Sequence, residues 1–149
     1  MSPRPKGRPP RDLGAVAAYR LVVEYEGSRF QGWQRQGEGQ SQAGVRTVAG
    51  TLERLLAQQG LAPRSLVGSG RTDANVHALG QMAHLHLAAP GPRPEDLQIL
   101  LDRALPSDLA VVQVARCDAA FHARHDALRR TYLYRIALRR SGLSKPFAW

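Results

Sequence analysis

The sequence predicts an α+β fold of the ferredoxin-like kind, with its elements in the order β-α-β-β-α-β. Two observations carry this prediction. Apolar residues recur at helical spacing in two stretches, and short runs rich in alternating or β-branched residues flank each stretch. In this arrangement one antiparallel sheet carries both helices on one face. The other face of the sheet is then left for a ligand.

The first half of the unit is a strand followed by a helix. Residues 19–25 are rich in aromatic and β-branched side chains and end at Glu26-Gly27-Ser28, which predicts a strand. A loop rich in glycine and glutamine follows, through Gly44. Thr47 is then a potential N-cap and Gly60 lies past the end of the next stretch. Between them an amphipathic helix is predicted by the spacing of Val48, Leu52, Leu55 and Leu56.

The second half contains two strands, a helix and a last strand. Residues 64–69 predict a short strand, and residues 78–87 predict a longer one that is half buried. In the longer strand, Ala83, Leu85 and Leu87 alternate with Met82, His84 and His86. Pro94, the acidic first turn after it, and the spacing of Leu97, Leu100, Leu101 and Ala104 predict the second helix. Residues 109–115 predict the last strand.

Residues beyond this unit predict a further element. Residues 130–138 read as a fifth strand that starts a second sheet unit. The chain would then consist of a disordered, basic, proline-rich tail (1–17), a ferredoxin-like domain (18–117) and an arginine-rich segment (118–149) that opens a second, mostly missing domain. Because a chain that stops on exposed aromatic residues usually continues, we expect a truncated version of a larger protein.

The charge balance predicts a polyanionic partner. Lysine and arginine number 21 against 12 acidic residues, and only Lys6 and Lys145 are lysines. Arginine forks suit phosphates and stack on bases. An arginine-rich proteome with a merely soluble surface remains an alternative. The arginines concentrate between residues 116 and 140, which we interpret as an RNA-facing stretch, although a strand edge kept charged against aggregation would look the same.

Several classes of protein are disfavoured. Cys117 is the only cysteine, so a disulfide within the chain and a cysteine-based zinc cluster are excluded, and a cytoplasmic setting fits. The N-terminal tail lacks the apolar region of a secretory signal, and no run of residues is long enough to span a membrane. His84 and His86 lack a third ligand nearby, which favours the polar face of a sheet over a metal site.

The stretch Gly70-Arg71-Thr72-Asp73-Ala74-Asn75-Val76-His77-Ala78 is the most informative part of the chain. It forms a turn of small residues between two predicted strands. An aspartate in such a turn can act as a nucleophile. The turn alone is weak evidence, because Asp and Asn are favoured in turns for local hydrogen-bonding reasons.

Five motifs in order strengthen this hypothesis. They are Gly32-Trp33-Gln34-Arg35-Gln36, Thr47-Val48-Ala49-Gly50-Thr51-Leu52-Glu53, the stretch Gly70 to Ala78, Phe121-His122-Ala123-Arg124, and Arg130-Thr131-Tyr132-Leu133-Tyr134. Together they resemble the tRNA pseudouridine synthase A family. The resemblance implies an isomerase that converts uridine to pseudouridine in the anticodon arm of tRNA, acts as a homodimer, and needs no cofactor or metal.

The resemblance also implies roles for individual residues. Asp73 would be the nucleophile, with Arg71 pairing with its carboxylate, and whether it attacks the sugar or the base stays open. Tyr132 would pack on the target base, which must leave its stack to reach the carboxylate. Tyr134 shares its strand face, and His77 is expected to be structural. RNA or substrate contacts are implied for Arg124, Arg129, Arg130, Trp33, Gln34 and Gln81.

Departures from the family pattern keep alternatives open. Asn75 replaces the usual glycine, Ala49 replaces the usual glutamine, and the family's second half is absent. A non-catalytic ferredoxin-like RNA-binding module, or an inactive synthase fragment, is the main alternative. The aromatic run typical of an RNA-recognition sheet is not found. A glycoside hydrolase is a weaker hypothesis, because no second carboxylate suggests itself as a partner for Asp73.

Overall fold

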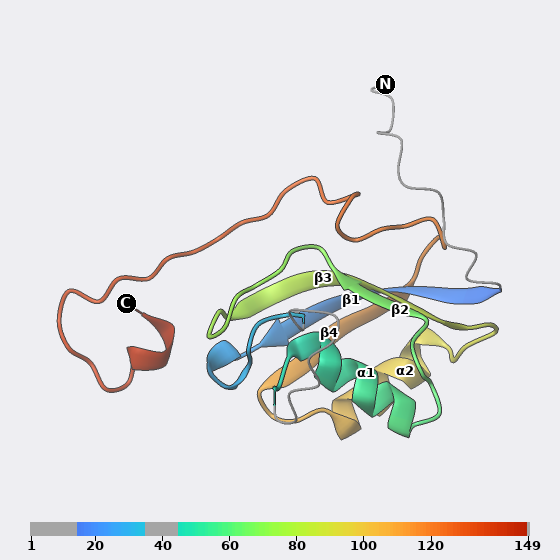
Figure 1. Cartoon of the computed structure of the whole chain (residues 1–149), viewed down its shortest axis with the longest axis horizontal. Helices are drawn as coiled ribbons and strands as arrows, with labels where there is room; N and C mark the ends of the chain where they lie inside the picture. The colour runs from blue at the N-terminus through green and yellow to red at the C-terminus, as the bar shows by residue number, and fades with distance from the viewer. Residues whose placement is uncertain (1–14, 35–44, 149) are drawn as a thin grey trace.

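The computed structural model describes residues 15–34 and 45–148. These residues contain a four-stranded antiparallel sheet with strand order β2-β3-β1-β4 and two α-helices (Figure 1). The elements are β1 (Val16–Tyr25), α1 (Val48–Gln58), β2 (Ser65–Gly68), β3 (Ala78–Ala88), α2 (Pro94–Ala104) and β4 (Leu109–Arg116), with short 3-10 helices at Gly27–Arg29 and Lys145–Phe147. This element order and sheet topology confirm the predicted ferredoxin-like unit.

Both helices cover the same face of the sheet (Figure 1). In β1 every second side chain points toward them, and Tyr19, Leu21 and Val23 are fully buried. They pack into one core with apolar residues of the helices and of β3, namely Leu52, Leu56, Leu97, Leu101, Ala83, Leu85 and Leu87. The apolar residues that recur with the helical period and those that alternate along the strands therefore pack together in a single two-layer core.

The helix ends form as the sequence predicts. The Thr47 hydroxyl accepts a hydrogen bond of 3.1 Å from the Gly50 amide and so caps α1. Gly60 follows α1 with a φ of 74°, a left-handed conformation that glycine adopts without strain. Pro94 begins α2 at a position where its missing N–H costs nothing.

The helix-free face of the sheet is partly covered. His84 and His86 lie on this face, as predicted from their alternation with the core residues, but they are 2% and 5% exposed. The Ala123 amide donates a 3.1 Å hydrogen bond to His84 Nδ1, and the ring of His122 lies 4.7 Å from that of His84. The segment after β4 thus closes one end of the face that was expected to be open.

The predicted fifth strand is wrong. Residues 130–138 are exposed and form no strand, and among the described residues 129–140 make no backbone–backbone hydrogen bond. A segment with strand-like alternation forms a strand only when a neighbouring strand is available to pair with it. Within the described part of the chain no strand pairs with this segment. In Figure 1 the segment crosses above β3 as a single extended trace.

Two further predictions concern the ends of elements and the tail. β1 begins at Val16, three residues before the predicted start, so residues 16 and 17 belong to the sheet and not to the tail. The rest of the predicted disordered tail and most of the loop through Gly44 lie outside the described residues. Within the described ranges no helix has the length and apolarity needed to cross a membrane.

Candidate active site at the Asp73 turn

The turn between β2 and β3 is fixed by backbone hydrogen bonds to the chain that follows β1. The Trp33 amide donates to the Thr72 carbonyl at 3.0 Å, and the Asn75 amide donates to the Phe30 carbonyl at 3.3 Å. Within the turn, the Val76 amide donates to the Asp73 carbonyl at 3.3 Å. Asp73 therefore sits between two residues that are tied to a different part of the chain, which restricts its position.

Side chains reinforce the same attachment. The hydroxyls of Tyr25 and Thr72 are 2.8 Å apart and share a hydrogen bond. The Gly27 amide donates to His77 Nδ1 at 3.0 Å, and His77 Nε2 donates to the Pro146 carbonyl at 2.6 Å. Both ring nitrogens of His77 are thus used in contacts with the backbone, and Nδ1 also lies 3.3 Å from Glu26 Oε1.

Two glycines allow the close approach. A Cβ on Gly32 would overlap the Thr72 carbonyl oxygen, and one on Gly27 would overlap the Val76 carbonyl oxygen. Gly32 also has a φ of 85°, in the left-handed region. The glycine of the Gly32-Trp33 motif is therefore required by the packing of the turn.

The turn holds Asn75 in the left-handed region, with a φ of 65°. Asn is the side chain that tolerates this conformation best after glycine. The structure therefore supports the interpretation that the turn survives the replacement of the usual glycine.

The structure does not bring Arg71 and Asp73 together as predicted. Both side chains are exposed, and no ion pair or hydrogen bond joins them among the described residues. Both lie in the strand-connecting turn, where nothing from the rest of the described chain covers them. The Asp73 carboxylate is consequently free to meet a ligand from solvent, and Arg71 is free to meet the same ligand.

Tyr132 lies beside the turn although its segment forms no strand. Its hydroxyl would be 3.7 Å from a Cβ on Gly70, and its side chain is 61% exposed. Burial raises the pKa of the Tyr25 hydroxyl, the hydrogen bond with Thr72 partly offsets this rise, and the nearby Tyr132 adds to it. Tyr134, two residues on, is 86% exposed. Of the two tyrosines, Tyr132 is the one with contacts near Asp73.

The residues predicted to contact RNA separate into two groups. Gln34, Arg124, Arg129 and Arg130 are exposed. Trp33 is 1% exposed, so its side chain packs inside the domain, and its contact with RNA stays a prediction. Its indole packs against Gly68, where a Cβ would not fit, and 6.3 Å from the ring of Tyr25. Gln81 is half-buried and its amide is hydrogen-bonded to Ser69 and Gly70 at the start of the turn, and its contact with RNA stays a prediction.

Sequence reasoning misses two residues that hold the site. The sequence pattern predicts Tyr25 only as part of a strand and Ser69 only as the end of one. The position of Tyr25 at the end of the strand with its polar tip toward the turn is the one available signal, since a buried tyrosine hydroxyl usually finds a partner. Ser69 carried no signal.

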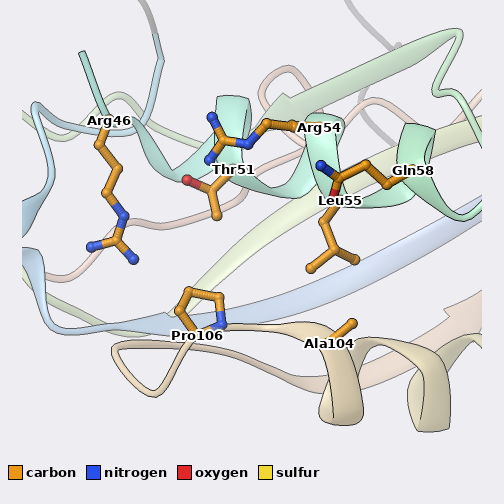
Figure 2. A pocket seen from close by; sticks show the side chains of 7 residues that line it. All are labelled: Arg46, Thr51, Arg54, Leu55, Gln58, Ala104 and Pro106. Carbon is orange, nitrogen blue, oxygen red and sulfur yellow. The ribbon is translucent and has the colours of Figure 1, made fainter. Parts of the chain in front are cut away.

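A separate hollow lies on the helix side of the molecule. It has a volume of about 320 Å³ and is lined by Arg46, Thr51, Arg54, Leu55, Gln58, Ala104 and Pro106 (Figure 2). Arg46 forms a two-pronged ion pair with Asp108, with both N–O distances at 2.6 Å. None of the turn residues lines this hollow, so it is not part of the candidate active site.

The described residues offer no obvious place for a metal. Among residues 15–34 and 45–148, no group of three or more His, Cys, Asp or Glu side chains is arranged to hold a metal ion. The site contains an exposed carboxylate on a fixed turn, with Arg71 in the same turn and Arg130 and Tyr132 beside Gly70. This arrangement suits nucleophilic attack on a bound polyanion.

The fold and the turn together define a ferredoxin-like protein with a candidate nucleophilic aspartate. A family model described as tRNA pseudouridine synthase matches residues 21–126, which include the turn and all of the sheet except the first half of β1. The chain belongs to the tRNA pseudouridine synthase family.

Curated relatives agree with this assignment. The chain is 46% identical over 119 residues to a tRNA pseudouridine synthase A of Thermus thermophilus, covering 80% of this chain and 44% of the relative. It is 44% identical over 126 residues to one of Paramagnetospirillum magneticum, covering 85% and 47%. It is 39% identical over 118 residues to one of a Bacillus species, covering 79% and 46%. The chain thus spans about half the length of the curated relatives that it matches.

Proposed function

We propose that this chain carries the nucleophile of a tRNA pseudouridine synthase, and that Asp73 is that nucleophile. The reaction is an isomerisation. The bond between uracil N1 and the ribose breaks, the base turns while it is held, and a bond forms between uracil C5 and the same ribose carbon. The proton on C5 is lost and N1 gains one, so no oxidant or reductant is required.

The observation that carries this proposal is the combination of a fixed backbone and an exposed carboxylate at Asp73. Thr72 and Asn75 are hydrogen-bonded to Trp33 and Phe30 on either side of it, while its side chain stays accessible. A nucleophile held in place by its surroundings loses little freedom when the substrate binds. Tyr132 beside Gly70 would then cover the extruded base.

The arginines after β4 support a tRNA substrate. Arg124 and Arg129 are exposed on the segment that leads from the sheet toward Tyr132. They would bind phosphates around the target nucleotide and help to offset the cost of unstacking it. We place the target in the anticodon arm, the protein in the cytoplasm and its active form in a homodimer, on the strength of the family resemblance. The length of the relatives supports a second domain that begins with residues 118–149.

The proposal is tested by incubating the chain with an unmodified tRNA transcript and measuring pseudouridine by nucleoside chromatography. We expect product from the wild type and a loss of a factor of about 10³ or more in Asp73→Asn, which keeps the shape of the side chain and removes the nucleophile. Asp102→Asn, an exposed change on α2, is the matched control and should retain activity.

The other outcomes separate the alternatives. Equal product from the wild type and Asp73→Asn would exclude Asp73 as the nucleophile. Tight tRNA binding without product would favour the RNA-binding module or inactive fragment.

A further inference from the structure

Arg130 differs from the arginines around it because its head group is already used within the protein. Its Nε donates to the Ser69 carbonyl at 2.7 Å and one terminal nitrogen donates to the Arg124 carbonyl at 2.8 Å. By contrast, Arg129 and Arg135 are exposed and make no hydrogen bond or ion pair with any described residue. A planar guanidinium can join two carbonyls in this way, whereas a lysine ammonium offers a single charged point.

The carbonyl that Arg130 binds lies at the entry to the Asp73 turn. The ladder between β2 and β3 ends at Gly68 and Ala83, and the Ser69 amide then donates to the Met82 carbonyl at 2.7 Å. Gln81 continues this support beyond the strand. It accepts from the Ser69 hydroxyl at 2.9 Å and donates to the Gly70 carbonyl at 2.7 Å.

The carbonyls of the two residues before Arg71 are therefore both held by side chains. Gln81 holds Gly70 and Arg130 holds Ser69. Gln81 belongs to the sheet, whereas Arg130 comes from the segment that has no strand partner. The bond from Arg130 links the turn to this segment two residues before Tyr132, whereas the bond from His77 meets the chain only at Pro146.

The same segment carries Tyr132. In an extended chain, residues two apart point to the same side, so Arg130 and Tyr132 both face the turn. The Arg130 side chain and the Tyr132 hydroxyl lie 3.6 to 3.7 Å from the position of a Cβ on Gly70. Within the described part of the chain no backbone ladder holds residues 129–140, and Arg130 is the hydrogen-bonded side chain nearest to Tyr132 in this stretch.

We propose that Arg130 is a positioning residue whose guanidinium joins the turn that carries Asp73 to the segment that carries Tyr132. In this role it sets the distance between the nucleophile and the tyrosine and does not bind tRNA phosphate. The consequence for catalysis depends on the proposed function, whereas the structural link does not. The two parts can therefore be tested separately.

The structural link is tested by ¹⁹F NMR of the full chain with 3-fluorotyrosine at its four tyrosines, assigned by single Tyr→Phe variants. We expect Arg130→Lys and Arg130→Ala to move the Tyr132 resonance toward that of the exposed Tyr134. Arg135→Ala, which also removes a positive charge from the segment, should leave the Tyr132 resonance unchanged. The resonance of Tyr19, which is fully buried, reports whether each variant is folded.

The kinetic consequence is tested with tRNA. Arg130→Lys should lower kcat by roughly 10-fold to 100-fold, because the charge remains but the fork is lost and the tyrosine is misplaced. The KM for tRNA and its salt dependence should change little. Arg129→Ala should instead raise KM and reduce the salt slope by about one counterion, and Arg129→Lys should restore both.

Each result decides the proposal. A folded Arg130→Lys variant with the wild-type Tyr132 resonance would overturn the structural link. Wild-type kcat in Arg130→Lys together with a raised KM in Arg130→Ala would show a phosphate contact in its place. If the wild-type chain forms no pseudouridine, the proposed function fails while the NMR result still decides whether Arg130 positions Tyr132.

Discussion

The Asp73 turn and the segment that carries Tyr132 meet at Gly70, but different kinds of contact hold them. The turn is bound mainly through its own backbone, by the Trp33 amide and the Phe30 carbonyl, and the Tyr25 hydroxyl adds a hydrogen bond to the Thr72 side chain. Residues 129–140 have no such backbone bonds among the described residues, and side chains attach the segment that contains them, through Arg130 near its start and through His77 to the Pro146 carbonyl near its end. The half of the candidate site that carries Asp73 is therefore part of the folded domain, whereas the half that carries Tyr132 is held to the domain by side-chain contacts.

This difference has a physical consequence for the order in which the two halves loosen. Bonds that belong to a packed core open only with the core, whereas a segment with few buried contacts can open locally at little cost in free energy. We therefore expect changes in the turn to affect the stability of the whole domain. Changes in the attachment should mainly affect the position of Tyr132.

The largest effect is expected for Gly32→Ala, which disrupts the turn. The new methyl group would overlap the Thr72 carbonyl oxygen, and the φ of 85° is unfavourable for alanine. We expect the free energy of unfolding to fall by about 3 kcal/mol or more, measured by urea denaturation.

Gly60→Ala separates the two causes of this loss. Gly60 has a φ of 74° but no other atom within 4 Å of the added methyl group. It should lose only the conformational term, about 1 kcal/mol. If Gly32→Ala costs no more than Gly60→Ala, the close packing of the turn against Thr72 is not required for stability.

An intermediate effect on the free energy of unfolding is expected when the pH is lowered, because the histidines that contact the segment after β4 become protonated. Burial, together with the neighbouring His122 and His86, lowers the pKa of His84 from 6.5 to about 4, and Asp126 partly opposes this shift. Burial likewise lowers the pKa values of His86 and His122. The unfolded chain therefore binds more protons than the folded chain between about pH 4 and 6.5, so stability is complete above this window and falls as the pH decreases through it.

His84 alone should contribute a loss of about 2 kcal/mol between pH 7.5 and pH 5. His84→Asn removes the titration while its side-chain oxygen can still accept the hydrogen bond from the Ala123 amide. Urea unfolding at the two pH values should therefore show a smaller loss in this variant than in the wild type. Identical losses would mean that another group causes the acid sensitivity.

The same comparison explains which parts could be predicted from the sequence. Thr47, Gly60 and Pro94 mark helix ends through local preferences, and the residues that cap a helix are close to it in the chain. The left-handed conformation at Asn75 in the Asp73 turn is also a local preference, because asparagine tolerates it better than other side chains. These features depend on a few neighbouring residues, so a sequence pattern is sufficient to find them.

The features that were missed depend on residues far apart in the chain. Trp33 follows a glycine in a polar stretch, and its burial results from the missing side chain of Gly68 on another strand. The alternation of residues 130–138 is a real strand pattern, but pairing requires a neighbour that the pattern itself cannot supply. His84 and His86 were placed on the correct face, and their cover by Ala123 and His122 is again a contact between distant residues.

The smallest effect is expected at Asn75, where the turn departs from the family pattern without losing its shape. Asn75 is exposed, and its φ of 65° is tolerated by Asn and preferred by Gly. Asn75→Gly should change the free energy of unfolding by only about 0.5 kcal/mol, because relief of the backbone is offset by the greater freedom of glycine in the unfolded chain. Asn75→Ala, which has no polar side chain to favour this conformation, should cost about 1 kcal/mol. If Asn75→Ala lowers the free energy of unfolding as much as Gly32→Ala does, the Asn75 side chain itself supports the turn. The backbone preference of asparagine would then not explain why this residue can replace glycine here.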